Sequence, residues 1–229
     1  MCSNEINKNI SDYLNNKEYH VEDVKNCDNC KEVEYLFILE SPHTEEIKNG
    51  YPLAGESGKD VSRYLLNINE PFGKLIKEKK LKEKKIAIVN VSNVPLQPFN
   101  TKKDDKEISN IKDIDKIKNN LESIRKREIS DSTIGSKKLF ELFKKRISEY
   151  IENNESLKFI ILCGEFVKKY FDYFLKNSKV QVKHIINLND YESKILYVPH
   201  PSRHQWTFID KYKINLETLK NDWTNNSQN

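Results

Sequence analysis

Four short runs of apolar residues recur along the chain, and they limit the folds that it can form. They lie at residues 33–40, 85–91, 157–163 and 194–198, and each has the length of a strand rather than of a helix. The segments between them carry apolar residues at helical spacing. Buried strands joined by helical crossovers are typical of a parallel sheet covered on both faces. The sequence therefore predicts an α/β fold, a three-layer α/β/α sandwich around a short, mostly parallel four-stranded sheet.

Helices are expected wherever the apolar spacing switches to a period near 3.6 residues. One of them carries four aromatic residues on a single face, which favours a role in the core rather than in stacking on nucleic-acid bases. These aromatic residues are Phe166, Tyr170, Phe171 and Phe174. The predicted helices cover residues 59–68, 108–129, 139–151, 165–176 and 209–223.

The length of 229 residues suits one domain and is sufficient to bury a core. Hydrophobic residues make up 37% and aromatic residues 10% of the chain, which argues against general disorder. We expect a single domain over residues 1–229, with a polar N-terminal extension (1–31) and a charged helical insertion (101–135) that forms an outer helix rather than part of the core.

The net charge of +4 is compatible with a nucleic-acid partner but does not require one. No apolar run has the length of a membrane span or of a signal peptide, so we expect a cytoplasmic protein without a membrane partner. Cys27 and Cys30 form a CxxC pair, which is half of a metal site. Because Cys2 and Cys163 do not form a second pair, we expect two reduced thiols on a surface turn and no bound metal.

Polar residues follow three of the four predicted strands. Glu40-Ser41-Pro42-His43 ends the first strand, Asn90 ends the second, and His200-Pro201-Ser202 follows the fourth. The carboxyl ends of parallel strands lie at one edge of the sheet, where open α/β sheets bind their ligands. Residues that are far apart in the sequence are therefore expected to converge there and form a site.

These loops, in this order, resemble the motifs of the uracil-DNA glycosylase superfamily. Residues 40–43 resemble its first motif, and residues 50–58 (GYPLAGESG) are similar to a G-x-P-F-x-G-x-x-G stretch of some branches. Asn90 matches the base-reading asparagine, residues 159–164 match an apolar strand that ends in glycine, and His-Pro-Ser at 200–202 matches the second catalytic motif. The resemblance covers residues 33–204, with a gap over the charged insertion.

The resemblance implies a monofunctional DNA glycosylase, a monomer without metal or organic cofactor. Such an enzyme flips uracil or a modified pyrimidine out of DNA and hydrolyses its N-glycosidic bond, leaving an abasic site. The implied catalytic residues are Glu40, Ser41 and His200, and the implied base-binding residues are His43, Leu53 and Asn90. The implied DNA-binding residues are Gly55, Ser57, Gly58, Ser202, Arg203 and His204.

Two departures from the family pattern concern the substrate. Leu53 stands where relatives place an aromatic residue that stacks on uracil, and His43 replaces the glycine or tyrosine of other branches. Both departures make a bulkier base, such as a hypermodified pyrimidine of phage DNA, an alternative to uracil, and with it antiviral defence an alternative to DNA repair. A non-catalytic DNA-binding member of the fold is a second alternative. An unrelated α/β hydrolase or nucleotide-binding enzyme ranks last, because the chain has neither a phosphate loop nor a nucleophile elbow.

Each of these residues also has a purely structural interpretation. Glu40 suits the cap of a following helix, and Asn90 suits hydrogen bonding to a loop backbone. Gly55 and Gly58 suit turns with positive φ, and a histidine after a strand, such as His200, is often a structural hydrogen-bonding residue. The positions of these side chains in the fold distinguish the two interpretations.

Overall fold

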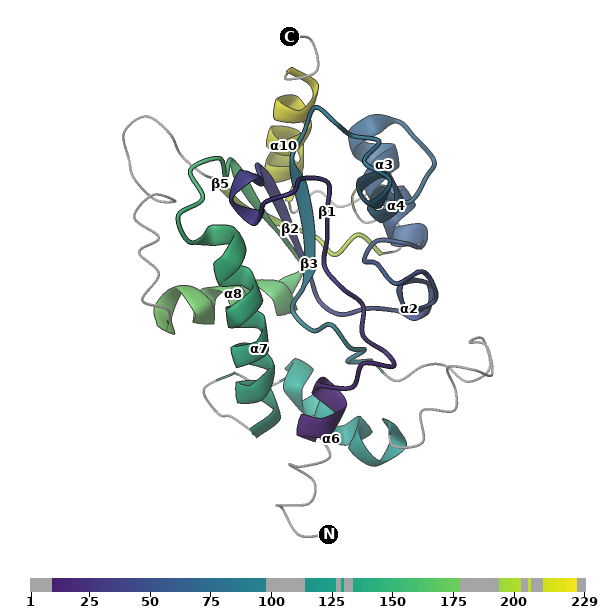
Figure 1. Ribbon diagram of the computed structural model, residues 1–229, viewed down its shortest axis with the longest axis vertical. Helices are drawn as coiled ribbons and strands as arrows, with labels where there is room; N and C mark the ends of the chain where they lie inside the picture. The colour runs from purple at the N-terminus through teal and green to yellow at the C-terminus, as the bar shows by residue number, and fades with distance from the viewer. Residues whose placement is uncertain are drawn as a thin grey trace.

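The computed structural model describes residues 10–97, 114–126, 129, 134–177, 194–202, 206 and 212–225 (Figure 1). Arg203 and His204, two of the predicted DNA-binding residues, lie outside the described residues, as does Cys2. The first part of the predicted insertion, residues 101–113, also lies outside them.

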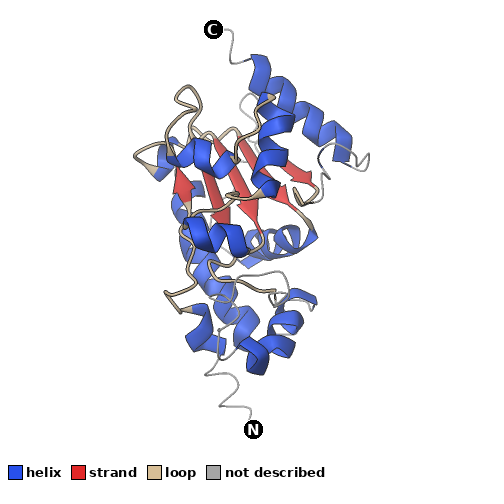
Figure 2. Cartoon of the chain, turned by 90° about the vertical axis from the view of Figure 1, so that its right-hand side faces the viewer, coloured by secondary structure: helices blue, strands red, loops and turns tan. Residues whose placement is uncertain are grey.

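A five-stranded sheet with the order β1-β3-β2-β4-β5 forms the centre of the molecule (Figure 2). The four predicted strands are present and parallel, as β2 (Tyr35–Leu39), β3 (Ile86–Asn90), β4 (Phe159–Cys163) and β5 (Lys194–Val198). The chain runs from the central strand β2 to β3 on one side and then crosses to β4 on the other. The sheet therefore has a switch point between β2 and β4, the place where such sheets form a crevice for ligands.

The prediction of four strands missed β1 (Val24–Lys25), which the N-terminal extension contributes. β1 pairs antiparallel with β3, with Val24 opposite Ile88. Asn26 extends this contact, because its side chain donates to the carbonyls of Leu81 and Lys84 and accepts from the N–H of Ile86. A two-residue strand has no alternating pattern to detect, so its position depends on these tertiary hydrogen bonds.

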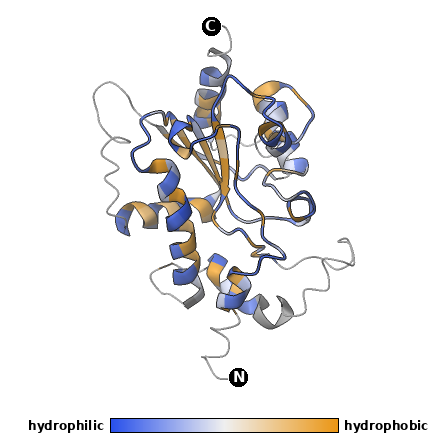
Figure 3. Ribbon diagram, viewed as in Figure 1, coloured by the Kyte–Doolittle hydropathy of each residue, from blue (hydrophilic) through white to orange (hydrophobic). Residues whose placement is uncertain are grey.

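Helices cover both faces of the sheet, and the apolar residues of Figure 3 lie where these layers meet. Along β2, Leu36 and Ile38 face one core cluster, while Tyr35 and Phe37 face the other. The first cluster includes α7 (Ile134–Ile151) and α8 (Glu165–Asn177), and the second includes α3 (Glu56–Leu66), α4 (Phe72–Lys77) and α10 (Lys213–Asn225). The α/β sandwich is thus confirmed, with a mixed five-stranded sheet.

The predicted core role of the aromatic stripe on α8 is confirmed. Tyr170, Phe171 and Phe174 are fully buried, and Phe166 packs against the same cluster. The sequence did not predict α4 or the six-residue helix α2 (Thr44–Asn49), because a helix of fewer than two turns does not repeat its apolar spacing.

The charged insertion contributes to the core as well as to the surface. Its described helix α6 (Ile114–Lys126) lies within the predicted range and buries Leu121 and Ile124 completely in the first core cluster. Ile129 is also buried there. We expected an outer helix with no part in the core, and these apolar residues at helical spacing among many charges explain the difference.

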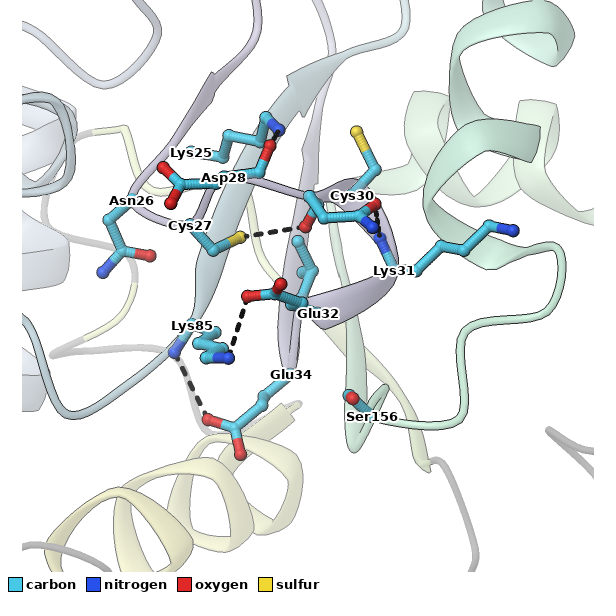
Figure 4. Close-up of polar contacts among 12 residues, drawn as sticks. Lys25, Asn26, Cys27, Asp28, Cys30, Lys31, Glu32, Glu34, Lys85 and Ser156 are labelled. Carbon is cyan, nitrogen blue, oxygen red and sulfur yellow. Dashed lines mark hydrogen bonds and ion pairs between the residues drawn. The ribbon is translucent and has the colours of Figure 1, made fainter.

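The CxxC pair ends at Cys30, the first residue of the 3-10 helix η1 (Cys30–Glu32; Figure 4), and the expected surface turn is corrected in part, because Cys27 is buried and Cys30 half-buried. The Cys27 thiol donates to the carbonyl of Asn29 at 3.4 Å, and the Cys30 sulfur points in another direction. The described residues contain no group of three or more His, Cys, Asp or Glu side chains placed to hold a metal ion. None of the described helices has the length and apolar composition needed to cross a membrane.

Candidate active site at the carboxyl edge of the sheet

The backbone register brings the ends of β2 and β3 side by side. Leu39 lies opposite Asn90, and the N–H of Ser92 donates to the carbonyl of Glu40 at 3.0 Å. On the other side of the sheet, Cys163 lies opposite Val198, two residues before His200. A Cβ atom on Gly164 would lie 3.4 Å from the Cβ of His200, so this histidine stands beside the end of β4. The convergence predicted from the strand ends is present in the fold.

Asn90 carries a buried side-chain amide without a hydrogen-bond partner. The residue is 1% exposed, and neither its Nδ2 nor its Oδ1 has a partner within the described part of the chain. Leaving a buried polar group unpaired costs about 1–3 kcal/mol, so proteins rarely retain one without a reason. The structural interpretation, in which Asn90 hydrogen-bonds a loop backbone, therefore has no support among the described residues.

Arg146 of α7 fixes the backbone around Asn90. Its Nη2 donates to the carbonyls of Asn90 and Val91, at 2.7 and 2.9 Å. Its Nη1 pairs with both carboxylate oxygens of Asp23, at 2.8 and 3.0 Å. One guanidinium thus joins the N-terminal extension, the end of β3 and α7, and the main chain of Asn90 is held while its amide remains unpaired.

His200 is a neutral imidazole at physiological pH. Burial lowers its pKa from 6.5 to about 4, and the charges of His43 and Arg125 act in the same direction. The Glu40 carboxylate opposes them by favouring the charged imidazolium, but its effect is smaller than that of burial. Glu40, His43 and Arg125 therefore all lie close enough to His200 for their charges to act on it.

Glu40 is largely buried and forms an ion pair with Arg125. Its Oε1 lies 2.5 Å from the Nε of Arg125, and its side chain is 12% exposed. Ser41, which is 4% exposed, accepts a hydrogen bond from the N–H of Leu96 at 3.3 Å. The hydroxyl of Ser41 therefore attaches the loop after β3 to the loop after β2 and keeps its own proton for a further bond.

Glu46, which our sequence prediction missed, joins the backbone at two of the predicted base-binding residues, His43 and Leu53. It lies in α2, and one carboxylate oxygen accepts from the N–H of His43 at 2.8 Å, the other from the N–H of Leu53 at 2.6 Å. Burial raises its pKa from 4.5 to about 7. Glu46 lies three residues after the N-cap residue His43, and an acid at that position is the sequence signal for a side chain that bonds back to the N-cap backbone.

Leu53 supports the fold more directly than it supports a ligand. Its backbone has a φ of 53°, in the left-handed region, and its side chain is 2% exposed within the second core cluster. Gly58 packs against this turn, because a Cβ there would lie 1.9 Å from the carbonyl oxygen of Leu53. Gly73 approaches in the same way, with a Cβ position 1.8 Å from the carbonyl oxygen of Pro52.

The remaining predicted residues occupy different positions at this edge. His43 is exposed and precedes α2, while Gly55 is the N-cap of α3 and Ser57 lies in its first turn. Gly55 has a φ of −104° and Gly58 is helical, so neither is a turn glycine with positive φ. Ser202 is half-buried beyond β5. The fold thus places Glu40, Asn90 and His200 at one edge, whereas Leu53 and Gly58 are packed inside.

Two arginines of this site, Arg125 and Arg146, were not among the predicted residues. Both lie in helices with many lysines and glutamates, where nothing in the pattern distinguishes a buried ion pair from a solvated charge. Only the tertiary fold brings their guanidinium groups to the ends of β2 and β3.

Changing Glu46 to Gln should alter how stability depends on pH. With a folded pKa of about 7 and an unfolded one near 4.5, the folded protein retains a proton that the unfolded chain releases. The wild type should therefore lose stability as the pH rises from about 4.5 to 7, by at most about 3.5 kcal/mol at roughly 1.4 kcal/mol per pKa unit. Denaturant titrations at several pH values measure this slope, which Glu46→Gln should remove. Glu45→Gln, an exposed neighbour in the same helix, is the control, and parallel curves for Glu46→Gln and wild type would contradict the expectation.

Changing Gly58 to Ala should destabilise the protein by more than about 2 kcal/mol, because the added methyl group would overlap the carbonyl oxygen of Leu53. Urea unfolding measures this loss. Ser57→Ala, one residue earlier in the same helix, should change the free energy of unfolding much less, and equal effects of the two substitutions would refute the packing argument.

Comparison with known sequences does not assign the chain to a family. No protein-family model matches it, and no curated protein matches it. The function must therefore be inferred from the residues at the carboxyl edge of the sheet.

Proposed function

We propose that this protein is a monofunctional DNA glycosylase, which flips a uracil or a modified pyrimidine out of DNA and hydrolyses its N-glycosidic bond. The observation that carries the proposal is the buried, unpaired amide of Asn90 at the same sheet edge as Glu40 and a neutral His200. The order of these residues along the chain, within motifs that resemble those of uracil-DNA glycosylases, supports the same conclusion.

Asn90 suits the reading of a flipped base. Its amide offers a donor and an acceptor together, which is what the Watson–Crick edge of a pyrimidine requires. Arg146 holds the carbonyl of Asn90, so the amide is preorganised and needs little rearrangement when a base arrives. A base would supply the two hydrogen bonds that the described protein residues do not.

His200 suits the stabilisation of the leaving base. Breaking the glycosidic bond places negative charge on the base, and a hydrogen-bond donor directed at its oxygen lowers the energy of that charge. A neutral imidazole donates from one nitrogen without protonation, and burial keeps His200 in this form. In this proposal His200 stabilises the departing anion without transferring its proton.

Glu40 suits the sugar side of the reaction. The sugar acquires positive, oxocarbenium-like character as the bond breaks, and a carboxylate stabilises it or orients the attacking water. Ser41 retains a hydroxyl proton that is available to position the same water. No lysine is placed by the motifs to act as an amine nucleophile, so hydrolysis should end at the abasic site.

The side chains around the base favour a modified pyrimidine as strongly as uracil. Leu53 lies in the core and has no aromatic face, so base stacking would have to come from elsewhere. His43 is exposed beside His200 and offers room and hydrogen-bonding capacity for a substituent on the base. A hypermodified base of phage DNA, and hence a function in defence, fits these two features.

Replacing Asn90 by Leu should abolish base release and leave the protein as stable as before or more stable. The substitution removes the buried polar atoms that have no partner and retains a similar volume. We expect a loss of at least about 100-fold in base release, with the free energy of unfolding unchanged or up to about 3 kcal/mol higher.

Asn93→Leu is the matched control, because its buried amide donates to the carbonyl of Val21 at 2.7 Å. That change should destabilise the protein. If Asn90→Leu destabilised it to the same extent, Asn90 would have a structural role and the proposal would lose its main support.

The direct test is incubation with oligonucleotides containing uracil and with natural phage DNA carrying modified cytosines, followed by detection of abasic sites. His200→Ala should lower base release by about 100- to 1,000-fold, and Glu40→Gln should lower it clearly. Glu152→Gln, an exposed glutamate that directly follows α7 and precedes the start of β4, should leave the activity unchanged. Tight DNA binding without base release from any of these substrates would favour the non-catalytic alternative.

A further inference from the structure

The helix α6 of the charged insertion extends to the candidate site. Leu121 and Ile124 are completely buried, and the carbonyl of Arg125 accepts a hydrogen bond from the Nζ of Lys169 in α8 at 3.1 Å. The backbone at the end of α6 is thereby fixed against the body of the protein. The side chain of Arg125 leaves this anchored turn and reaches Glu40.

The contact between Arg125 and Glu40 has the features of a positioning interaction. The Nε–Oε1 distance is 2.5 Å, and the glutamate side chain is 12% exposed while the arginine side chain is 32% exposed. Shielding from water strengthens the pair relative to a surface salt bridge. Arg125 has no other side-chain partner within the described part of the chain, so Glu40 alone explains its orientation there.

The charge of Arg125 also acts on the neighbouring imidazole. Three charged or titratable groups face His200 from three segments: Glu40 after β2, His43 before α2 and Arg125 in α6. A carboxylate by itself would favour a protonated His200, and a nearby guanidinium opposes that effect. The guanidinium therefore adds to the effect of burial, which is the main reason that the imidazole of His200 stays neutral near the Glu40 carboxylate.

We propose that Arg125 is a positioning residue of the candidate site, which orients the Glu40 carboxylate and offsets its charge at His200. The expected effect of Arg125 on catalysis rests on the proposed function, whereas its effect on the protonation of His200 does not. The charged insertion then has a defined role, because it supplies the residue that orients Glu40 and partly offsets its charge at His200.

The first test is a titration of His200 by NMR in protein with isotope-labelled histidine. The five histidines of the chain allow assignment of the signal by comparison with His200→Gln. In Arg125→Gln, His200 should titrate at a higher pH than in the wild type, and Arg125→Lys should restore most of the original value. Lys126→Gln removes an exposed charge one residue later and should have no effect. An unchanged titration in Arg125→Gln would overturn the proposal, whether or not the protein releases bases.

The second test measures base release from the substrate identified with the wild type. Arg125→Gln should lower kcat by about 10- to 100-fold with little change in KM, as expected for a misplaced catalytic group. In a Glu40→Gln background, the same substitution should have a much smaller effect, because it acts through the glutamate. Independent, additive effects would refute positioning. Absence of activity in the wild type would refute the proposed function and leave the titration to decide the electrostatic role.

Discussion

The guanidinium of Arg146 is the contact on which the geometry of the sheet edge depends. It bonds to Asp23 ahead of β1 and to two carbonyls at the end of β3, and it comes from α7 on one face of the sheet. These carbonyls lie where the strand ladder ends, so the protein itself must satisfy them. Because Arg146 satisfies these carbonyls, the backbone at Asn90 is fixed, while its side-chain amide has no hydrogen bond to the described residues.

Several groups at this edge are kept in states that favour chemistry over stability. Asn90 has an unpaired amide, burial keeps the imidazole of His200 neutral, and burial raises the pKa of the Glu46 carboxyl to about 7. Each of these states costs free energy, and functional sites are where proteins tolerate such costs. The two core clusters on either side of the sheet provide the stability that makes this possible.

The parts of the structure that the sequence predicted are those with a strong local signal. The apolar runs placed four strands correctly, and the polar residues after them placed Glu40, Asn90 and His200 at the same edge of the sheet. β1 was not predicted because a strand of two residues shows no alternating pattern. Arg125 and Arg146 were not predicted because they lie in lysine-rich helices, where the sequence does not distinguish a buried ion pair from a solvated charge. Leu53 was misleading in another way, since its motif position suggested a ligand contact whereas the side chain packs in the core.

The turn at Leu53 limits how the specificity of such a site can change during evolution. Its backbone is left-handed, and Gly58 and Gly73 pack directly against the carbonyls of Leu53 and Pro52, so the main chain has no space to shift. Residues with β-branched side chains are strained in this conformation, so few substitutions at Leu53 are accessible. His43 is exposed and has an extended backbone, which nearly any amino acid adopts. If the proposed function holds, diversification toward new bases would proceed through the position of His43, while the neighbouring turn keeps its conformation.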